Sequence, residues 1–189
     1  SLDDQPVAQR SAALTELADR FFTDLARGSS EHPVCAATVD TALRWNIPTA
    51  HFEAFIESMQ MDLHIGHYDT YADLEKYVYG SAAVIGLQMV PILEPSSERA
   101  YGYAKDLGYA FQLANFIRDV GEDLDRERIY LPLDELAQFG VTAADVRSRV
   151  VTDQFREAVK FQIARVRRLE SASRPGIELL SPDSQPCIE

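Results

Sequence analysis

The stretch Gly108-Tyr-Ala-Phe-Gln-Leu-Ala-Asn-Phe-Ile-Arg-Asp-Val-Gly-Glu-Asp123 decides the fold of this chain. Its apolar residues cover most of the circumference of a helix, and a helix that is apolar nearly all round is typical of a protein interior. At about 100° per residue, its polar side chains gather within a wedge of roughly 80°. This stripe consists of Gln112, Asn115, Asp119 and Asp123. The stretch therefore predicts a helix buried in an all-α protein, with a polar stripe that faces something polar inside.

The stripe indicates a metal site. Two aspartates four positions apart repel each other on a helix, and burial without a partner would cost far more. A divalent cation resolves that conflict, since Mg²⁺ takes one or two carboxylates together with waters and phosphate oxygens. We therefore expect Asn115, Asp119 and Asp123 to bind Mg²⁺, with Mn²⁺ as an alternative, beside a diphosphate. A solvated helix face without function is the other interpretation of the D-x-x-x-D spacing. The continuation of the stripe through Asn115 and Gln112 favours the site.

Composition favours a single globular domain. The chain has 189 residues, 46% of them hydrophobic, and a formal net charge of −12, which argues against nucleic-acid binding. No apolar run approaches the roughly 20 residues that span a bilayer, and no signal peptide is visible. Cys35 and Cys187 are few and far apart, which indicates a reducing compartment and no disulfide framework. We expect a cytoplasmic protein, with peripheral membrane contact as a further option.

Hydrophobic periodicity predicts helices throughout and no strands. Thr70 and Thr142, each followed three residues later by an aspartate, are typical of helix starts, and Pro48 and Pro132 also stand where helices begin. His64 and His67 lack partners with zinc spacing, so we expect surface or capping residues. The predicted helices cover residues 6–27, 32–45, 49–63, 71–93, 97–124, 133–139, 143–149 and 153–173.

Four blocks of the sequence resemble a known family. The segment from Gln112 to Pro132, with Asp119, Asp123 and the run Arg-Ile-Tyr-Leu-Pro, is similar to the second aspartate-rich motif of the squalene/phytoene synthase family. Residues 59–62, 68–74 and 77–87 resemble the central helices of that family in order and spacing. The chain looks most like bacterial phytoene synthases, which implies a single helical bundle of the isoprenoid synthase type.

The resemblance implies a tunnel for an isoprenoid chain along the helix at 71–93. Periodicity alone favours an ordinary core stripe there. In the family the corresponding stripe lines the tunnel, and the tyrosine at the reacting end matches Tyr77, whose phenol could move a proton or steady a cation. Tyr79 points elsewhere on a helix and is expected to be a packing residue. We expect Tyr77 nearest the metal and Met89 deepest, and the remaining tunnel residues are Ser81, Ile85, Leu107 and Phe111.

The resemblance also implies residues that handle the diphosphate. Gln112 and Arg118 are expected to contact or orient it, and Arg128 and Tyr130 resemble the loop that closes over it. Asp62 follows a methionine in a family motif, and we expect it to be structural, with a nearby basic residue as its partner.

The implied reaction joins two geranylgeranyl diphosphate molecules head to head through a cyclopropyl diphosphate to phytoene, in carotenoid biosynthesis. Tyr77, Asp119 and Asp123 are the expected catalytic residues. A squalene or dehydrosqualene synthase that uses farnesyl diphosphate is one alternative. A family member without catalysis that serves as an assembly protein is another.

The start of the chain departs from the family pattern. The family carries two aspartate-rich motifs on facing helices, whereas Asp3 and Asp4 lack the spacing of the first and indicate a helix cap before Pro6. We therefore expect a chain truncated at both ends, which begins after the first motif and carries half of the metal site. Such a chain would show little or no activity by itself.

Overall fold

The computed structural model describes residues 5–188, so the expectation for Asp3 and Asp4 lies outside the described residues. Within that range the fold is helical, with one isolated parallel bridge between His67 and Ile129. The elements are α1 (Val7–Arg27), α2 (Pro33–Arg44), α3 (Thr49–Met61), α4 (Tyr71–Val78), η2 (Tyr79–Ala83), α5 (Val84–Ile92), α6 (Arg99–Arg118), α7 (Val120–Asp125), α8 (Leu133–Gln138), α9 (Ala143–Arg147), α10 (Asp153–Ser173), η3 (Arg174–Leu179) and η4 (Gln185–Cys187).

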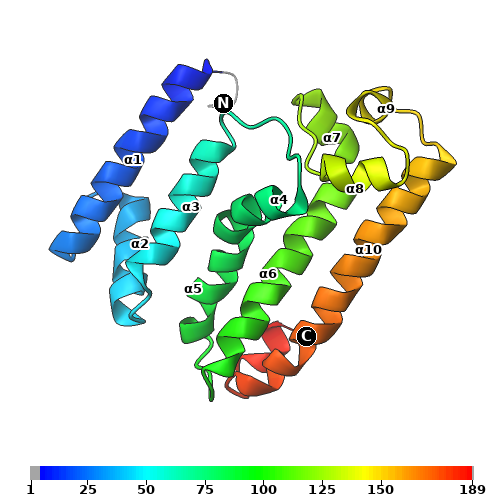
Figure 1. Cartoon of the computed structure of the whole chain (residues 1–189). Coiled ribbons are helices and arrows are strands. Elements are labelled where there is room, and N and C mark those ends of the chain that lie inside the picture. The colour runs from blue at the N-terminus through cyan, green and yellow to red at the C-terminus, as the bar shows by residue number, and fades with distance from the viewer. Residues whose placement is uncertain (1–4, 189) are drawn as a thin grey trace.

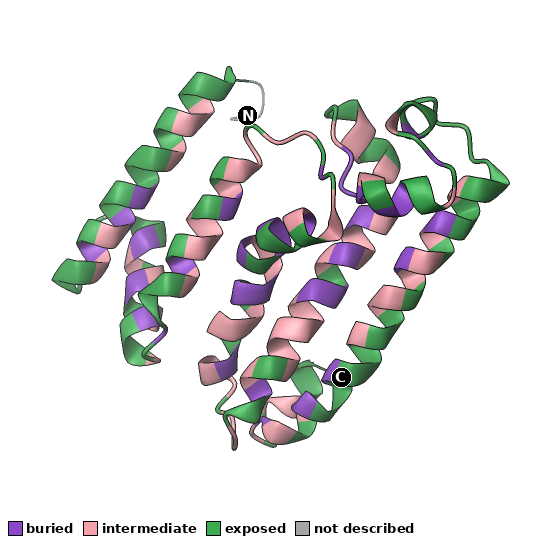
Figure 2. Cartoon of the chain, viewed as in Figure 1, coloured by how far each residue is buried: buried purple, intermediate pink, exposed green. Residues whose placement is uncertain are grey.

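The long helices form one bundle. In Figure 1, α1, α2 and α3 make one side of the molecule, and α5, α6 and α10 make the other. Helices α6 and α10 lie against each other along much of their length. Buried residues, purple in Figure 2, gather on the inner faces of these helices, while the outer face of α10 is mostly exposed. The all-α bundle expected from the sequence is confirmed, and no described helix is long and apolar enough to cross a membrane.

The helix expected at 71–93 is not continuous, because a π-helical segment, η2, separates α4 from α5. The Ser58 hydroxyl of α3 donates to the Tyr77 carbonyl at 2.9 Å, and both groups are buried. Gly80 packs against α3 so closely that an added Cβ would lie 2.0 Å from the Ala54 carbonyl oxygen. The neighbouring helix thus supplies a partner for a carbonyl of the widened turn. Single π-helical turns of this kind are frequent at functional sites.

The helix expected at 97–124 is interrupted at Asp119. Helix α6 ends at Arg118, and Asp119 has φ −99° and ψ 12° before α7 begins. The Asp119 amide still donates to the Asn115 carbonyl at 2.8 Å, and the Asp123 amide donates to the Asp119 carbonyl at 2.8 Å. The chain therefore bends at Asp119 while the hydrogen bonds of the helical turns on either side are kept. Asp119 and Asp123 remain one helical turn apart.

Glycines bring the two central helices close together. A Cβ at Gly86 would lie 2.5 Å from the Ala104 carbonyl oxygen, and one at Gly108 would lie 2.8 Å from the Ala82 carbonyl oxygen. Only a residue without a side chain permits that approach of α5 and η2 to α6. The same glycines are part of the cavity described below.

The predicted helix starts are confirmed at two threonines. Thr142 and Asp145 form a complete capping box at the start of α9. The Thr70 hydroxyl accepts a hydrogen bond from the Asp73 amide at 3.2 Å, at the start of α4. His64 and His67 are exposed, as expected for surface residues.

Candidate active site

The bend of α6 presents Asp119 together with its neighbour Arg118. The guanidinium of Arg118 donates two hydrogen bonds to the Asp119 carboxylate, at 2.6 and 2.7 Å. These hydrogen bonds hold the pKa of Asp119 below its usual value. Because the Arg118 side chain is 71% exposed, it can swing away toward an anion without breaking the core. Arg118 is thus placed where it neutralises Asp119 and remains free to bind a phosphate oxygen.

Asp123 lies one turn further along and is half-buried. Burial, followed by the negative charge of Asp119, raises the pKa of Asp123 to about 6. The carboxylate of Asp119 is therefore close enough to oppose the ionisation of Asp123. A cation between them would favour the ionised form of both.

The chemistry of the stripe fits Mg²⁺ with help from a substrate. Among residues 5–188 no group of three or more His, Cys, Asp or Glu side chains gathers as a metal site. Asp119 and Asp123 supply two carboxylates, and Asn115 lies one turn before Asp119 with an amide oxygen. Mg²⁺ is usually held by one or two carboxylates plus waters and substrate phosphates, so this donor set suits it without a closed protein cage.

Asp62 is the centre of a second polar cluster, which consists of Asp62, Tyr77, Arg128 and Tyr130. Its carboxylate accepts hydrogen bonds from the hydroxyls of Tyr130 at 2.7 Å and Tyr77 at 3.2 Å. Arg128 pairs with the same carboxylate at 2.9 Å and donates to the Asp62 carbonyl at 2.6 Å. The expectation that Asp62 is structural and pairs with a nearby basic residue therefore agrees with the geometry.

An aromatic stack surrounds this cluster. The rings of Phe116 and Tyr130 are stacked with centroids 4.1 Å apart, and Tyr77 lies 5.6 Å from both Tyr130 and Tyr68. Burial, then the hydrogen bond to Asp62 and the charge of Asp62, raises the pKa of Tyr130 to about 12. Burial also raises the pKa of Tyr77 far above its ordinary value. Both phenols therefore remain protonated near neutral pH and act as hydrogen-bond donors.

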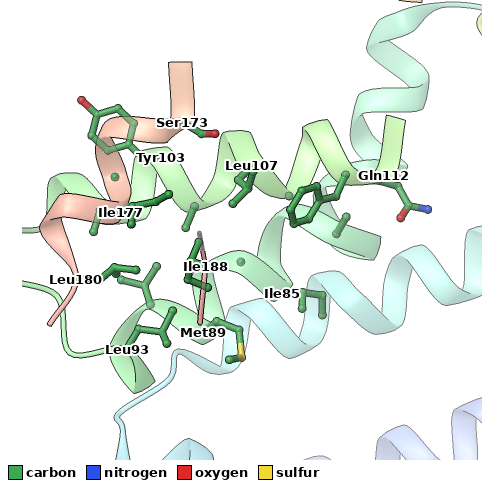
Figure 3. A pocket seen from close by; sticks show the side chains of 18 of the residues that line it. Ile85, Met89, Leu93, Tyr103, Leu107, Gln112, Ser173, Ile177, Leu180 and Ile188 are labelled. Carbon is green, nitrogen blue, oxygen red and sulfur yellow. The ribbon is translucent and has the colours of Figure 1, made fainter. Parts of the chain in front are cut away.

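An apolar cavity of about 380 Å³ runs between α5 and α6 and is closed at one end by the C-terminal turns. Figure 3 shows Ile85 and Met89 on one wall and Leu107 on the other, with the Gln112 amide at one end. Gln112 stands about two helical turns before Asp119, so the polar end of the cavity points toward the carboxylates. The Ser81 hydroxyl, also in the lining, is buried without a hydrogen-bond partner among residues 5–188.

The structure brings together most of the expected tunnel residues but not all of them. Ser81, Ile85, Met89, Leu107 and Phe111 line the cavity as expected from the sequence. Met89 is 43% exposed, however, so it stands at an open side of the cavity and not at its deepest point. Phe111, which also lines the cavity, is 60% exposed.

Two tyrosines differ from their expected positions. Tyr77 is not among the residues that line the cavity, because its ring is held in the aromatic stack by Asp62 and Tyr130. Tyr79, expected to be a packing residue, begins the π-helical segment and is 38% exposed. The widened turn changes the angular spacing between residues 77 and 81, so the four-residue spacing of an α-helix no longer places Tyr77 in line with Ser81.

Arg128 also differs in its contacts. The resemblance implied a contact with diphosphate, whereas both terminal nitrogens of Arg128 bind Asp62 and its side chain is only 18% exposed. Arg118 is the more accessible base of the two.

The cavity includes residues that sequence reasoning missed. Tyr103 on α6 and Ile177, Leu180 and Ile188 from the C-terminal turns complete its wall. The C-terminal turns follow α10 and lie far from α5 in the sequence. No periodicity within a single helix could have indicated these turns, whereas Tyr103 stands four residues before Leu107 on α6 and follows its helical spacing.

The chain matches known proteins along nearly its whole length. A profile described as squalene/phytoene synthase matches residues 2–189. Phytoene synthase 1, chloroplastic, of Arabidopsis thaliana is 40% identical over 168 residues, which cover 86% of this chain and 40% of that protein. Phytoene synthase of Arthrospira platensis is 36% identical, with 96% of this chain and 63% of that protein covered. The chain thus spans roughly half the length of these relatives.

A solved structure has the same fold. The crystal structure of squalene synthase HpnC from Alicyclobacillus acidocaldarius superposes with a TM-score of 0.87 at 29% identity, and the match covers 94% of this chain and 67% of that one. The bundle, the aspartate stripe and the matched sequences agree with one another. The chain belongs to the squalene/phytoene synthase family.

Proposed function

We propose that the protein is a prenyltransferase that joins two geranylgeranyl diphosphate molecules head to head, through a cyclopropyl diphosphate, to give phytoene in carotenoid biosynthesis. The observation that carries this proposal is the apolar cavity whose polar end, Gln112, points along α6 toward Asp119 and Asp123. Phytoene synthases at 36% and 40% identity support the choice of product. A long apolar tail and a diphosphate head would fit these two ends.

The head group is handled by the residues of the bend. Asp119, Asp123 and Asn115 would hold Mg²⁺, which neutralises the departing diphosphate so that the allylic carbon can ionise. Arg118 would leave Asp119 and donate its fork of N–H groups to phosphate oxygens, a geometry that suits phosphate well. Gln112 would orient the substrate where the cavity meets the carboxylates.

The aromatic stack would stabilise the allylic cation that forms when the diphosphate departs. The face of an aromatic ring attracts positive charge, and Tyr77 and Tyr130 hold their rings in place through Asp62. Arg128 balances the charge of Asp62, so the cluster adds no free carboxylate that would trap the cation. Neither tyrosine lines the cavity, but Tyr130 stacks on Phe116, which lies between Gln112 and Asp119, so we assign both rings to a cation beyond the polar end of the cavity and Arg128 to the support of Asp62.

Charge-removing variants test the metal site. Asp119→Asn and Asp123→Asn should each lower Mg²⁺-dependent release of diphosphate from geranylgeranyl diphosphate by about a hundredfold or more, because the departing charge loses its counter-ion. Asp125→Asn is the matched control, since Asp125 is exposed and pairs with Arg149 away from the stripe. Where turnover is too slow to follow, calorimetry with Mg²⁺ and inorganic diphosphate gives the same comparison. Equal behaviour of the stripe variants and the control would contradict the site.

A second candidate is a squalene or dehydrosqualene synthase that uses farnesyl diphosphate. The similarity to the squalene synthase structure at 29% identity favours it. Supplying both diphosphates in competition and identifying the products by mass spectrometry separates the two functions. A thirty-carbon product alone would replace the phytoene assignment.

A further inference from the structure

A buried ion pair joins α10 to α8 and shares no residue with the Asp62 cluster. Arg165 pairs with Glu135 of α8, and their side chains are only 14% and 8% exposed. Gln162, also buried, donates to Glu135 at 2.7 Å and accepts from Arg165 at 2.9 Å. The three side chains form a closed network with no role in the proposed chemistry.

Arg165 touches a second element as well. Its guanidinium carbon lies 3.8 Å from the centroid of the Tyr71 ring, at the first residue of α4. This close cation–π contact and the ion pair are made by one side chain at the same time. Arg165 therefore joins α4 and α8 to α10.

Both tyrosines of the Asp62 cluster lie close to these contacts, on α4 and in the segment that leads into α8. Tyr77 lies on α4, less than two turns after Tyr71, and Tyr130 precedes Glu135 by five residues. The segments are also joined by backbone hydrogen bonds from Ile129 to Gly66 at 2.9 Å and from Leu133 to Tyr68 at 3.0 Å. If either segment packed differently against α10, the Tyr77 and Tyr130 hydroxyls that bind Asp62 would also move.

Energetics favour a geometric role for this network. A buried ion pair contributes little net stability compared with apolar residues of similar volume, because both charges lose their hydration. The ion pair does restrict how α8 packs against α10, since a shift of either helix leaves a buried charge without a partner. The planar fork of arginine makes the restriction stronger, because its hydrogen bonds and its stacking both depend on orientation.

We propose that Arg165 is a positioning residue that sets the place of Tyr77 and Tyr130 around Asp62 through its joint hold on Tyr71 and Glu135. It acts on geometry and makes no contact with substrate. Its importance for catalysis rests on the proposed function, but its effect on the two tyrosines does not.

Fluorine NMR of the chain labelled with 3-fluorotyrosine tests the proposal without any substrate. The chain has eight tyrosines, and Tyr77→Phe and Tyr130→Phe assign two resonances by their loss. In Arg165→Met the resonances of Tyr77 and Tyr130 should shift or broaden, although neither residue is among the partners of Arg165 within residues 5–188. Arg168→Met, an exposed position on the same helix, should leave both unchanged.

A second variant covers a failure of Arg165→Met to fold. Arg165→Lys keeps the positive charge but loses the planar fork, and it should shift the same two resonances in the same direction by a smaller amount. A shift confined to Tyr71, the ring that Arg165 contacts directly, would overturn the proposal in either variant. Absence of enzymatic turnover would count against the proposed function and would leave this result intact.

Discussion

At the scale of single residues, the Glu135–Arg165 pair makes stability depend on pH. Burial acts to raise the pKa of Glu135, but the hydrogen bonds from Arg165 and Gln162 outweigh it and hold the pKa below the usual 4.5. A carboxyl with a lower pKa in the folded state contributes stability that is fully present above its unfolded pKa. That contribution is lost as the pH falls through the folded value.

Glu135→Gln should therefore destabilise the fold at neutral pH and matter less in acid. We expect a loss of about 2 kcal/mol at pH 7, because a buried arginine loses its charged partner while one hydrogen bond can be kept. The difference between wild type and variant should shrink as the pH falls below 4.5. Urea unfolding at several pH values measures it. A difference in the free energy of unfolding that stays constant across that range would show that the charge of Glu135 does not contribute to stability.

Residue types and spacing predicted the aspartate stripe, but they could not predict the contacts of each arginine near it. Asp119 and Asp123 stand out because two carboxylates lie on a helix that is otherwise mostly apolar. Nothing local distinguishes Arg128 from Arg118, and the partner that occupies Arg128 is Asp62, 66 residues away. Contacts over such a distance depend on how helices pack, and no pattern within one helix reports them.

At the scale of the elements, the π-helical segment depends on Gly80. An added Cβ would meet the Ala54 carbonyl oxygen at 2.0 Å and the Ser58 hydroxyl at 2.2 Å, and the backbone oxygen has little room to move. Gly80→Ala should lower the free energy of unfolding by about 3 kcal/mol, at the upper end of typical overpacking costs. Thermal unfolding followed by circular dichroism measures the change.

Gly102 on α6 is the matched control for Gly80. A Cβ there has nothing within 4 Å, so Gly102→Ala should stabilise the helix by up to about 1 kcal/mol. If Gly80→Ala were as harmless as Gly102→Ala, the close approach of η2 to α3 would not be a feature of the folded protein.

The helices themselves were predictable, whereas their interruptions were not. Apolar periodicity and the threonine caps gave the positions of the helices because both signals are local. The π-helical turn is accompanied by contacts from another helix, where Ser58 binds the Tyr77 carbonyl and Ala54 packs against Gly80. No glycine or proline stands at Asp119 to indicate the bend. Both interruptions lie beside the candidate site.

At the scale of the whole molecule, the bundle places a charged end and an apolar channel in line. Glycines at 86 and 108 bring the walls together, and the C-terminal turns close one end with Ile177 and Leu180. The length of an isoprenoid chain that the cavity accepts should therefore be set by the side chains of its walls, away from the carboxylates.

Ser81→Trp or Ile85→Trp should shorten the usable cavity and shift preference from the twenty-carbon toward the fifteen-carbon diphosphate. Both residues line the cavity, whose volume of about 380 Å³ leaves little room for an indole beside a long chain. Mg²⁺-dependent binding of inorganic diphosphate should be unchanged, because Asp119 and Asp123 are not altered. Competition between the two allylic diphosphates, followed by calorimetry or by product analysis, measures the preference.

Val151→Trp is the control for the added bulk, because Val151 is 56% exposed and is not among the cavity residues. It should leave the preference where it is in the wild type. An unchanged preference in both cavity variants would separate the cavity from chain-length selection, even if the metal site were intact. Loss of inorganic diphosphate binding in either variant would instead show that tryptophan had disturbed the bundle as far as the bend at Asp119, so the two causes can be told apart.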